Sequence, residues 1–384
     1  MRQLVTKCGF ILIMAVMVLA QACSPAAQQS PDPPRQLASP EPYDGSYAVA
    51  VILTNPDSDF TYIEYFDSEL NLVNTIRYPY SQLHSGSALK PPSLGDVVYV
   101  IPTTLMGLPG NSMVVSIDLA TGSITVYRVD LAAIDGLAVG DDYLLAVSYN
   151  EPGVRGARID LASGEVVYLV DEPWLLGNLL TEAGRLYSIR ADIGLDNTGI
   201  VMSLWLIDEQ LATVDQVDLN ALGINFPTFA TEPFDGGLFF VTSVAPEEES
   251  ETGYLMIHLY SPVDGSIQPF ASTVHGYTED LLVDGDKLLF FGSLADERLT
   301  GFVDIYDIAG GELIGTADLD YAPPYKALVH DGCLYVLAGS GPDCLLVKYG
   351  LEDGTYVELA RVSLAEVGSA AELDGFTVTE VFSR

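Results

Sequence analysis

The chain has 384 residues, 49% of them hydrophobic, which is enough to fill a sizeable core in one large repetitive domain or in two smaller ones. Acidic side chains outnumber basic ones by 53 to 16, giving a formal net charge of −37. A field of that sign repels phosphates and anionic lipid headgroups, which excludes nucleic acid as a partner. It attracts cations only diffusely, and its plainest effect is solubility.

The first 22 residues have the pattern of a signal peptide. Arg2 and Lys7 form a basic start, and the apolar run Gly9–Ala20 is too short to span a bilayer. The segment ends in Leu-Ala-Gln-Ala before Cys23, which resembles the bacterial lipobox, where small residues precede a cysteine that is acylated and becomes the mature N-terminus. Ordinary cleavage after the same Ala-Gln-Ala is the alternative.

The lipobox resemblance implies a lipoprotein of the bacterial cell envelope that faces outward, at the outer membrane if the envelope has two. Residues 23–44 contain the candidate acylated Cys23 and six prolines, and they show no apolar periodicity. This composition predicts a semi-extended, disordered tether between the membrane and a domain that covers 45–384.

After such processing Cys333 and Cys344 are the remaining cysteines. They lie on two apolar runs joined by a Gly/Ser/Pro turn, so we expect them to face each other across a hairpin and to form a disulfide in an oxidising compartment. A loop of this length is worth about 3 kcal/mol. Two buried free thiols remain the alternative. The absence of an accompanying His pair in the sequence does not favour zinc.

An internal repeat organises the rest of the chain. A turn with Gly or Asp precedes a short apolar run, and these turns are 44 to 52 residues apart. A second turn follows later in each copy, best seen in Asp118–Ser123 and Asp160–Glu165, while Phe66–Leu72 and Ile207–Thr213 have lost its glycine. The glycine supplies a positive φ, and the leading Asp caps the turn. The first turns fall at Gly45, Gly95, Gly140, Gly184, Gly236, Gly285 and Gly332.

Seven copies of about 45–50 residues with four short strands each predict an all-β fold, a seven-bladed β-propeller of four-stranded antiparallel blades. The first copy has no innermost strand ahead of it, because the proline-rich tether lies there. The alternating run Phe376–Phe382 at the end of the chain is therefore expected to complete the first blade and close the ring. A truncated eighth blade is the alternative.

The second turns resemble the D-x-x-T-G turn of quinoprotein-like (PQQ-like) and related WD40- or YVTN-type propellers, most clearly at Asp118–Gly122 and Asp160–Gly164. The resemblance covers 45–384 and implies architecture more than activity. Quinoprotein repeats place a tryptophan a few residues after that glycine, whereas this chain has Val126 and Tyr168 there. This departure speaks against a quinone-dependent dehydrogenase.

Propellers bind ligands on the face where the outer strand of one blade leads to the inner strand of the next. Several carboxylates at these positions could hold calcium or a cationic group, or they could line a water-filled channel; both interpretations stay open. We expect no resident cofactor beyond possible calcium. The polar residues at these connections are Asp135, Asn178, Thr228, Glu279, Asp280 and Lys326.

The sequence favours a monomeric, membrane-tethered propeller that binds a protein or a small ligand, or serves as a scaffold. The alternative is a hydrolase, lyase or lactonase with its site on the channel face and calcium held by carboxylates. An enzyme of that kind needs several polar side chains within metal-ligand reach. A scaffold needs an exposed apolar patch on a rim or blade edge.

Overall fold

The computed structural model describes parts of the unit Pro33–Arg384, whereas the other compact unit, Met1–Asp32, lies outside the described residues together with Cys23. Among the residues it describes, no helix is both long and apolar enough to cross a membrane. The described residues are 35–37, 45–55, 60–78, 83–84, 92–102, 113–131, 134, 136–148, 156–169, 179–182, 185–193, 200–210, 212–224, 227–244, 254–273, 277–294, 300–319, 324–339, 343–352, 354–367 and 377–383.

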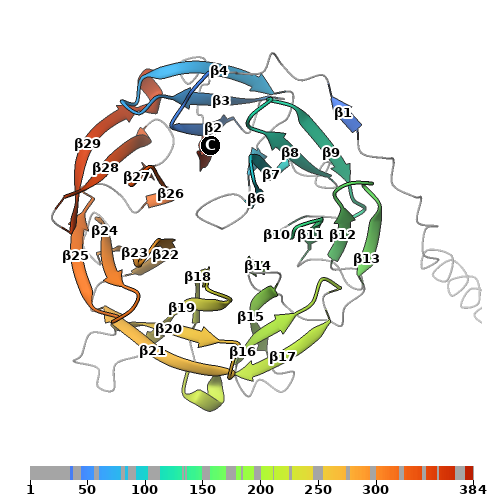
Figure 1. The fold of residues 1–384 in the computed structure, drawn as a ribbon, viewed down its shortest axis with the longest axis vertical. Helices are drawn as coiled ribbons and strands as arrows, with labels where there is room; N and C mark the ends of the chain where they lie inside the picture. Colours follow the sequence, from blue (N-terminus) through green and yellow to red (C-terminus); the bar gives the residue numbers. More distant parts are fainter. Residues whose placement is uncertain are drawn as a thin grey trace, which may run out of the picture. The chain divides into compact units, whose positions relative to one another are not determined.

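Seven antiparallel sheets stand around a ring, so the prediction of an all-β seven-bladed propeller is confirmed (Figure 1). We number the strands of each blade from the centre outward. Blade 1 consists of β30 (Thr377–Phe382), β2 (Val49–Thr54), β3 (Thr61–Phe66) and β4 (Leu72–Tyr78). Blade 3 consists of β10 (Gly136–Val139), β11 (Tyr143–Val147), β12 (Gly156–Asp160) and β13 (Val166–Leu169).

The later blades repeat the same order. Blade 4 consists of β14 (Leu179–Glu182), β15 (Arg185–Ile193), β16 (Ile200–Ile207) and β17 (Thr213–Asp218), and blade 5 of β18 (Pro227–Phe234), β19 (Gly237–Val244), β20 (Tyr254–Ser261) and β21 (Ser266–Thr273). Blade 6 consists of β22 (Tyr277–Asp284), β23 (Lys287–Ser293), β24 (Gly301–Asp307) and β25 (Leu313–Asp318). Blade 7 consists of β26 (Pro324–His330), β27 (Cys333–Ala338), β28 (Leu345–Glu352) and β29 (Thr355–Ser363). Two single-turn 3₁₀ helices follow outer strands, η1 (Asn220–Leu222) and η3 (Leu364–Glu366).

Blade 2 departs from the four-stranded plan. Its second to fourth strands are β7 (Val97–Pro102), β8 (Met113–Asp118) and β9 (Ile124–Arg128). Two short strands share the innermost position beside β7, namely β5 (Leu83–His84) and β6 (Ser93–Leu94). A further strand, β1 (Arg35–Leu37), pairs with the outer edge of β9, although this stretch falls in the segment expected to be a tether.

The chain closes the ring with its C-terminal strand, as expected from the sequence. β30 pairs antiparallel with β2 from Ala50 opposite Phe382 to Thr54 opposite Thr377, with a bulge at Ile52. The other edge of β2 pairs with β3. Blade 1 therefore takes its innermost strand from one end of the chain and its outer three from the other, and the described strands form no eighth blade.

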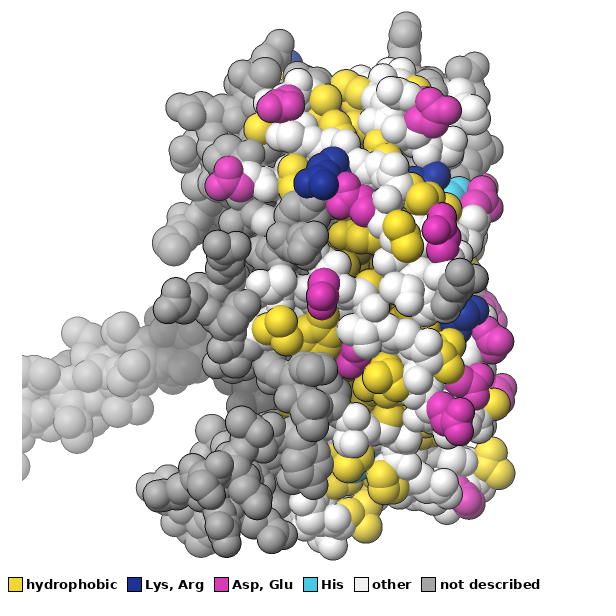
Figure 2. Space-filling model, turned by 90° about the vertical axis from the view of Figure 1, so that its left-hand side faces the viewer, with side chains coloured by type: hydrophobic (Ala, Val, Ile, Leu, Met, Phe, Trp, Pro, Cys, Tyr) yellow, Lys and Arg dark blue, Asp and Glu magenta, His cyan; other side chains and the backbone are white. Residues whose placement is uncertain are grey.

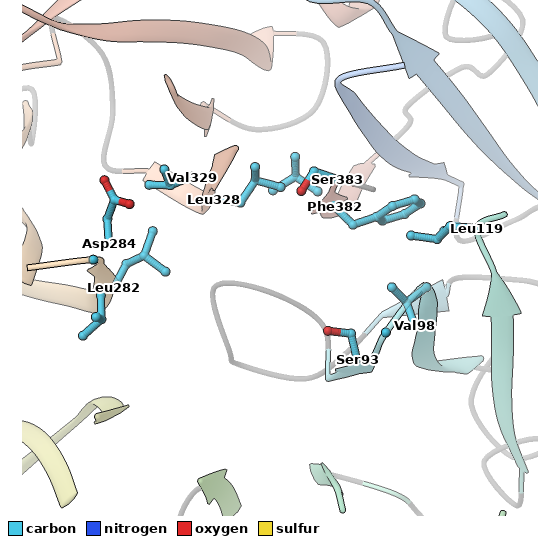
Figure 3. Close-up of a pocket in the computed structure, with 13 residues that line it drawn as sticks. Ser93, Val98, Leu119, Leu282, Asp284, Leu328, Val329, Phe382 and Ser383 are labelled. Carbon is cyan, nitrogen blue, oxygen red and sulfur yellow. The ribbon is translucent and has the colours of Figure 1, made fainter. Parts of the chain in front are cut away.

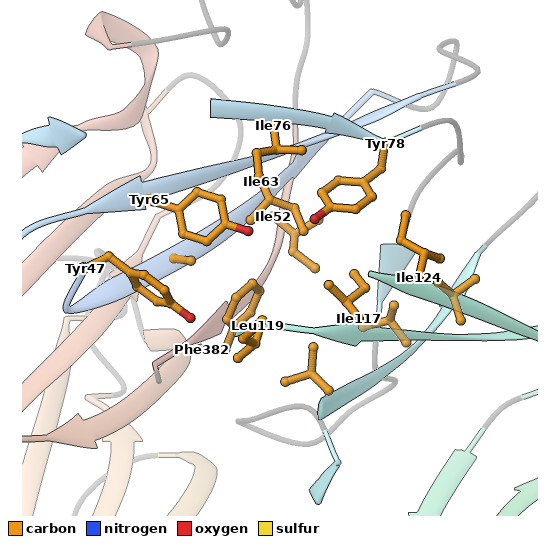
Figure 4. Packing of buried hydrophobic residues seen from close by; sticks show 14 of the residues in the cluster. Tyr47, Ile52, Ile63, Tyr65, Ile76, Tyr78, Ile117, Leu119, Ile124 and Phe382 are labelled. Carbon is orange, nitrogen blue, oxygen red and sulfur yellow. The ribbon is translucent and has the colours of Figure 1, made fainter. Parts of the chain in front are cut away.

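The blades pack face to face through alternating side chains. In β2, Val49, Val51 and Leu53 join a cluster with blade 7, and Ala50 and Ile52 join one with blade 2. A strand period of two therefore sends neighbouring residues to opposite interfaces, and both faces are buried. Each of the seven interfaces has such a cluster among the described residues. Figure 4 shows the one between blades 1 and 2.

The second turns are built as their sequences predict. In blade 2, Oδ1 of Asp118 accepts the backbone N–H groups of Ala120 and Thr121, both at 2.9 Å, and Gly122 has φ +66°. Blade 1 has lost this glycine, and Leu70 takes the left-handed conformation instead, with φ +62°. Leu70 is buried in the interface with blade 7, so its packing offsets the backbone strain.

Replacing Gly315 by alanine should loosen the contact between the outer strands of blades 6 and 7. A Cβ built on Gly315 would overlap the carbonyl oxygen of Gly354, and backbone cannot move aside as a flexible side chain can. We expect Gly315→Ala to lower the free energy of unfolding by about 1–3 kcal/mol in urea titration. The neighbouring, 44% exposed Ile314 is the control, since Ile314→Ala should cost less than about 0.5 kcal/mol. Equal effects would show that this close approach is not a constraint.

His258 should make the stability depend on pH. Its ring stacks on Phe240 between blades 4 and 5, its Nε2 lies 2.9 Å from Oγ1 of Thr242, and burial lowers its pKa. Because the folded pKa lies below the unfolded value of about 6.5, this contribution to stability is present above that pH and is lost as pH falls through the folded pKa.

The variant His258→Phe keeps the aromatic stack and removes the proton-binding group. Between about pH 7 and pH 5, its unfolding free energy should fall less than that of the wild type, measured by urea titration at each pH. His330→Phe, at a half-buried position beside Asp331, is the matched control. Identical pH profiles for His258→Phe and the wild type would show that His258 does not cause the pH dependence of stability.

Candidate functional site

A pocket of about 230 Å³ lies at one end of the central channel. Four consecutive blades supply its lining, blades 6, 7, 1 and 2, and Figure 3 shows the side chains arranged along an arc. Leu282 and Asp284 stand at one end of the arc, and Val98 and Leu119 stand at the other. The lining residues are Ser93, Gly95, Val98, Leu119, Leu282, Val283, Asp284, Gly285, Leu328, Val329, Val381, Phe382 and Ser383.

The pocket lies on the face that carries the turns between first and second strands and between third and fourth strands, which we call the turn face. β22 ends at Asp284 and turns back at Gly285, which has φ +60°, and β6 turns into β7 at Gly95, with φ +57°. Blade 1 has no such turn, because its first strand is the C-terminal β30. Phe382 and Ser383 therefore end at the channel mouth without a hairpin to cover them.

The side chains behind the walls of this channel-mouth pocket are firmly packed, and the surface that the walls leave accessible is slightly more polar than apolar. Leu119, Leu282, Leu328 and Phe382 are each at most 5% exposed and belong to the clusters between blades. The backbone N–H of Val283 donates to Oε1 of Glu232 on neighbouring β18 at 3.2 Å, which fixes the first strand of blade 6 against blade 5. The pocket is thus part of the scaffold and is preformed.

Asp284 is the one ionisable side chain among the described lining residues. It is half-buried, and it lies opposite Lys287 in the β22–β23 hairpin. The Lys287 ammonium instead lies 3.0 Å from Oδ1 of Asp286. The Asp284 carboxylate is therefore the ionisable group that a bound molecule would meet in the cavity, together with the hydroxyls of Ser93 and Ser383.

Further carboxylates surround the channel on the turn face. We call the acids at the first turns of the blades the turn carboxylates. Near these seven lie three described basic side chains: Lys287 is 3.0 Å from Asp286, His330 is 3.4 Å from Asp331, and the Arg158 guanidinium is 3.9 Å from Asp142. The potential at the channel mouth is therefore negative. The turn carboxylates are Asp96, Asp141, Asp142, Asp235, Asp284, Asp286 and Asp331.

The residues expected from the sequence lie toward the opposite face, where outer strands lead to inner ones. Two of the six, Asp135 and Asn178, fall outside the described residues. The others lie on the first strands of blades 5, 6 and 7, as their assignment to the channel required: Thr228 on β18, Glu279 and Asp280 on β22, and Lys326 on β26.

Two of these residues have described side chains. Oδ1 of Asp280 accepts the N–H of Leu281 at 2.8 Å. Lys326 is 3% exposed and lies on the same strand face as Leu328, which packs between blades 7 and 1. Neither Asp280 nor Lys326 lines the pocket at the channel mouth. The pocket was not predicted from the sequence, because the residues predicted to bind a ligand lie toward the other face. The apolar pairs just ahead of the turn glycines, such as Leu328-Val329, were the available signal.

Within the described parts of the chain, no group of three or more His, Cys, Asp or Glu side chains is placed to hold a metal ion. Calcium therefore stays a prediction from the sequence. The disulfide prediction needs correction, because both thiols are free. Cys333 begins β27 opposite Gly350, whereas Cys344 immediately precedes β28, so the hairpin register places them at opposite ends of β27. Burial raises the pKa of the Cys344 thiol to about 12.

An exposed apolar patch lies on the outside of blades 6 and 7, and we call it the rim patch. Figure 2 looks onto this side and shows hydrophobic side chains between more polar surroundings. The close approach of Gly315 to the Gly354 carbonyl joins the two outer strands beneath it. Patches of this kind mark surfaces that bind other proteins. The rim patch comprises Leu313, Ile314, Leu351, Val357 and Leu359.

No model of a known protein family matches the sequence, and no curated protein is similar to it. The chain is similar in fold to solved structures. An acylaminoacyl peptidase of Pyrococcus horikoshii matches 73% of the chain at 15% identity with a TM-score of 0.51, and the chain spans 46% of that peptidase's length.

Two further structures match over most of their own length. An oligogalacturonate lyase in complex with manganese matches 82% of this chain and 85% of its own at 13% identity, and a putative 6-phosphogluconolactonase of Bacteroides fragilis matches 94% and 99% at 12% identity. Both have a TM-score of 0.50. Identities this low show the fold alone, and that fold is the seven-bladed β-propeller.

Proposed function

We propose that the protein is a binding propeller, anchored through a lipid on Cys23 to the outward side of a bacterial envelope membrane, and that it holds its ligand in the channel-mouth pocket. The observation that supports binding is the pocket itself, a preformed cavity to which four blades contribute and which holds one carboxylate, Asp284, and the hydroxyls of Ser93 and Ser383. Concave, preformed sites with a few fixed polar groups are typical of ligand binding. The rim patch offers a second surface, for a protein partner.

Catalysis is the weaker alternative for this pocket. Hydrolysis or elimination needs a nucleophile, a base or a metal whose reactive atoms converge on one point. The described lining offers one carboxylate and the hydroxyls of Ser93 and Ser383. A calcium-dependent hydrolase, lyase or lactonase on the opposite face has the names of two structural neighbours in its favour, but identities of 12–13% carry a fold and not an activity. The quinoprotein-like turns are likewise a resemblance of architecture.

An uncharged apolar dye should bind at the channel mouth. We expect the fluorescence of N-phenyl-1-naphthylamine to rise when the folded protein is added, because the dye leaves water for a cavity whose accessible surface is partly apolar. Val329→Trp places a large side chain at this half-buried lining position and should weaken binding by at least about tenfold, or 1.4 kcal/mol. Val263→Trp, at a 91% exposed turn position of blade 5, is the matched control and should bind as the wild type does.

The same preparation tests catalysis. Asp284→Asn should leave any turnover of p-nitrophenyl acetate or a simple lactone unchanged, with calcium or with chelator, since a binding pocket contributes nothing to the reaction. Turnover that depends on Asp284 would overturn the binding function in favour of an enzyme. Dye binding that Val329→Trp does not weaken would place the ligand site elsewhere.

The lipid anchor has its own test. In a bacterial host, Cys23→Ser should abolish incorporation of radiolabelled palmitate and release the protein from the membrane fraction, because acylation supplies the chains that stable anchoring needs. Cys8→Ser is the matched control, since Cys8 belongs to the expected signal peptide and should have no effect. Palmitate on the Cys23→Ser protein, or membrane attachment of this variant equal to the wild type, would contradict lipidation at this position.

A further inference from the structure

We propose that the outer edge of β9 in blade 2 binds an extended segment of a partner protein as an added β-strand, and that β1 occupies this edge until the partner displaces it. The surface is separate from the channel-mouth pocket and from the rim patch. The partner segment has at least five residues, contains no proline where it pairs, and places an acidic residue opposite Arg128.

The structure shows that this edge accepts a strand. β1 pairs antiparallel with β9, from Arg35 opposite Val126 to Leu37 opposite Ile124, and lies on the outside of blade 2 (Figure 1). The other six outer strands in the described part of the chain have no further strand beside them. The edge of a sheet presents unpaired N–H and C=O groups, which bind extended peptides through main-chain hydrogen bonds. β1 is thus a peptide already seated at a strand-addition site.

β1 covers only part of the edge. β9 has five residues, Ile124–Arg128, and its pairs with β1 stop at Val126. The two residues ahead of Arg35 in the sequence are prolines, which have no N–H to donate to a ladder over the last two residues of β9. A strand that served only to shield the edge would extend along all of it. A proline-free segment forms two more residue pairs than β1 does, so it can replace β1.

The acceptor strand stays in place without β1. The inner edge of β9 pairs with β8 over all five residues. Ile124 and Val126 are buried in the cluster between blades 1 and 2, and Tyr127 is buried in the cluster between blades 2 and 3. Loss of the three pairs with β1 therefore leaves a packed strand with a free edge.

The residues of β9 indicate the chemistry of the partner. The strand reads Ile-Thr-Val-Tyr-Arg, without acid, glycine or proline, and its one charge is the exposed Arg128. Arg128 forms no ion pair with another described residue. An acidic side chain directly opposite it gains a cross-strand pair. Because the whole chain has a net charge of −37, we expect the rest of the partner segment to be neutral or basic.

Disulfide trapping tests the site in the full chain. Thr125 lies opposite the middle residue of β1, so Thr125→Cys places a thiol at the centre of the edge. The capped peptide Glu-Val-Arg-Cys-Leu should be trapped about fivefold to tenfold more than Pro-Pro-Arg-Cys-Leu, because only the first pairs with all of β9. The second peptide copies residues 33–37 of the chain with Cys in place of Gln36. The measurement is intact-mass spectrometry at a fixed concentration of 2-mercaptoethanol.

The control for thiol reactivity is Val263→Cys, in a turn of blade 5 where the native side chain is 91% exposed. This variant should trap both peptides equally, since no strand edge aligns them. Equal trapping of the two peptides by Thr125→Cys would overturn the strand-addition site, because the ladder would then contribute nothing.

Displacement of β1 tests its role as the resident occupant. In the Thr125→Cys background, Arg35→Pro with Gln36→Pro should raise trapping of Glu-Val-Arg-Cys-Leu several-fold. Consecutive N–H groups of a strand point to opposite edges, so one of the two substitutions removes a donor from the pairing with β9. An unchanged far-ultraviolet circular dichroism spectrum checks that the ring is intact. Trapping that the two prolines leave unchanged would show that β1 does not compete for the edge.

A charge reversal tests the acidic residue of the partner. In the same background, Arg128→Glu should reverse the preference, so that Lys-Val-Arg-Cys-Leu is trapped more than Glu-Val-Arg-Cys-Leu. The unsubstituted Arg128 should show the opposite order. The same order in both proteins would overturn the pairing of an acidic residue with Arg128.

Discussion

The pairing of β30 with β2 is the contact on which the whole ring depends. It joins the last strand of the chain to the first strand of the repeat, so it cannot form until nearly all the chain is present. It also places Val381 in the cluster between blades 7 and 1 and Phe382 in the cluster between blades 1 and 2. A non-local contact of this kind costs loop-closure entropy before it contributes any stability, so closure is expected to be the slow event in folding.

Closure gives every blade two neighbours, and this determines which strand faces must be apolar. In an open array the terminal repeats need a polar outer face, whereas here a strand such as β2 is buried on both faces along its whole length. The energy of the fold therefore lies mainly between blades, in seven similar apolar clusters. The channel-mouth pocket lies where blades 6, 7, 1 and 2 border the central channel.

Local features of this fold could be predicted from sequence because their causes are local. An Asp that caps its own turn and a Gly with positive φ, as at Asp118 and Gly122, mark a hairpin wherever they occur, and their spacing predicted the number of blades. The pairing register of two strands is harder to predict from sequence, since it depends on the conformation of the loop that joins them. The sequence placed Cys333 beside Cys344, and the β27–β28 register places Cys333 beside Gly350.

Features assembled from distant segments could not be predicted in the same way. The sequence shows that the first blade lacks the turn glycine. It does not show that burial against blade 7 holds Leu70 at a left-handed φ. Lys326 was expected to reach the channel; it is 3% exposed and does not line the channel-mouth pocket. The pocket needs Leu119, Leu282, Leu328 and Phe382 together, and only the closed ring brings these residues to one place.

The short strand β1 has a mechanical consequence. It holds the chain to the outer edge of β9 through three residue pairs, whereas β2 is held on both edges along its full length. Tension applied ahead of Arg35 loads these three pairs first. Their release would free the residues between β1 and β2, roughly 35 Å of extended chain, before any load reaches the ring. Release of β1 would therefore lengthen the segment ahead of β2 and leave the ring of blades intact.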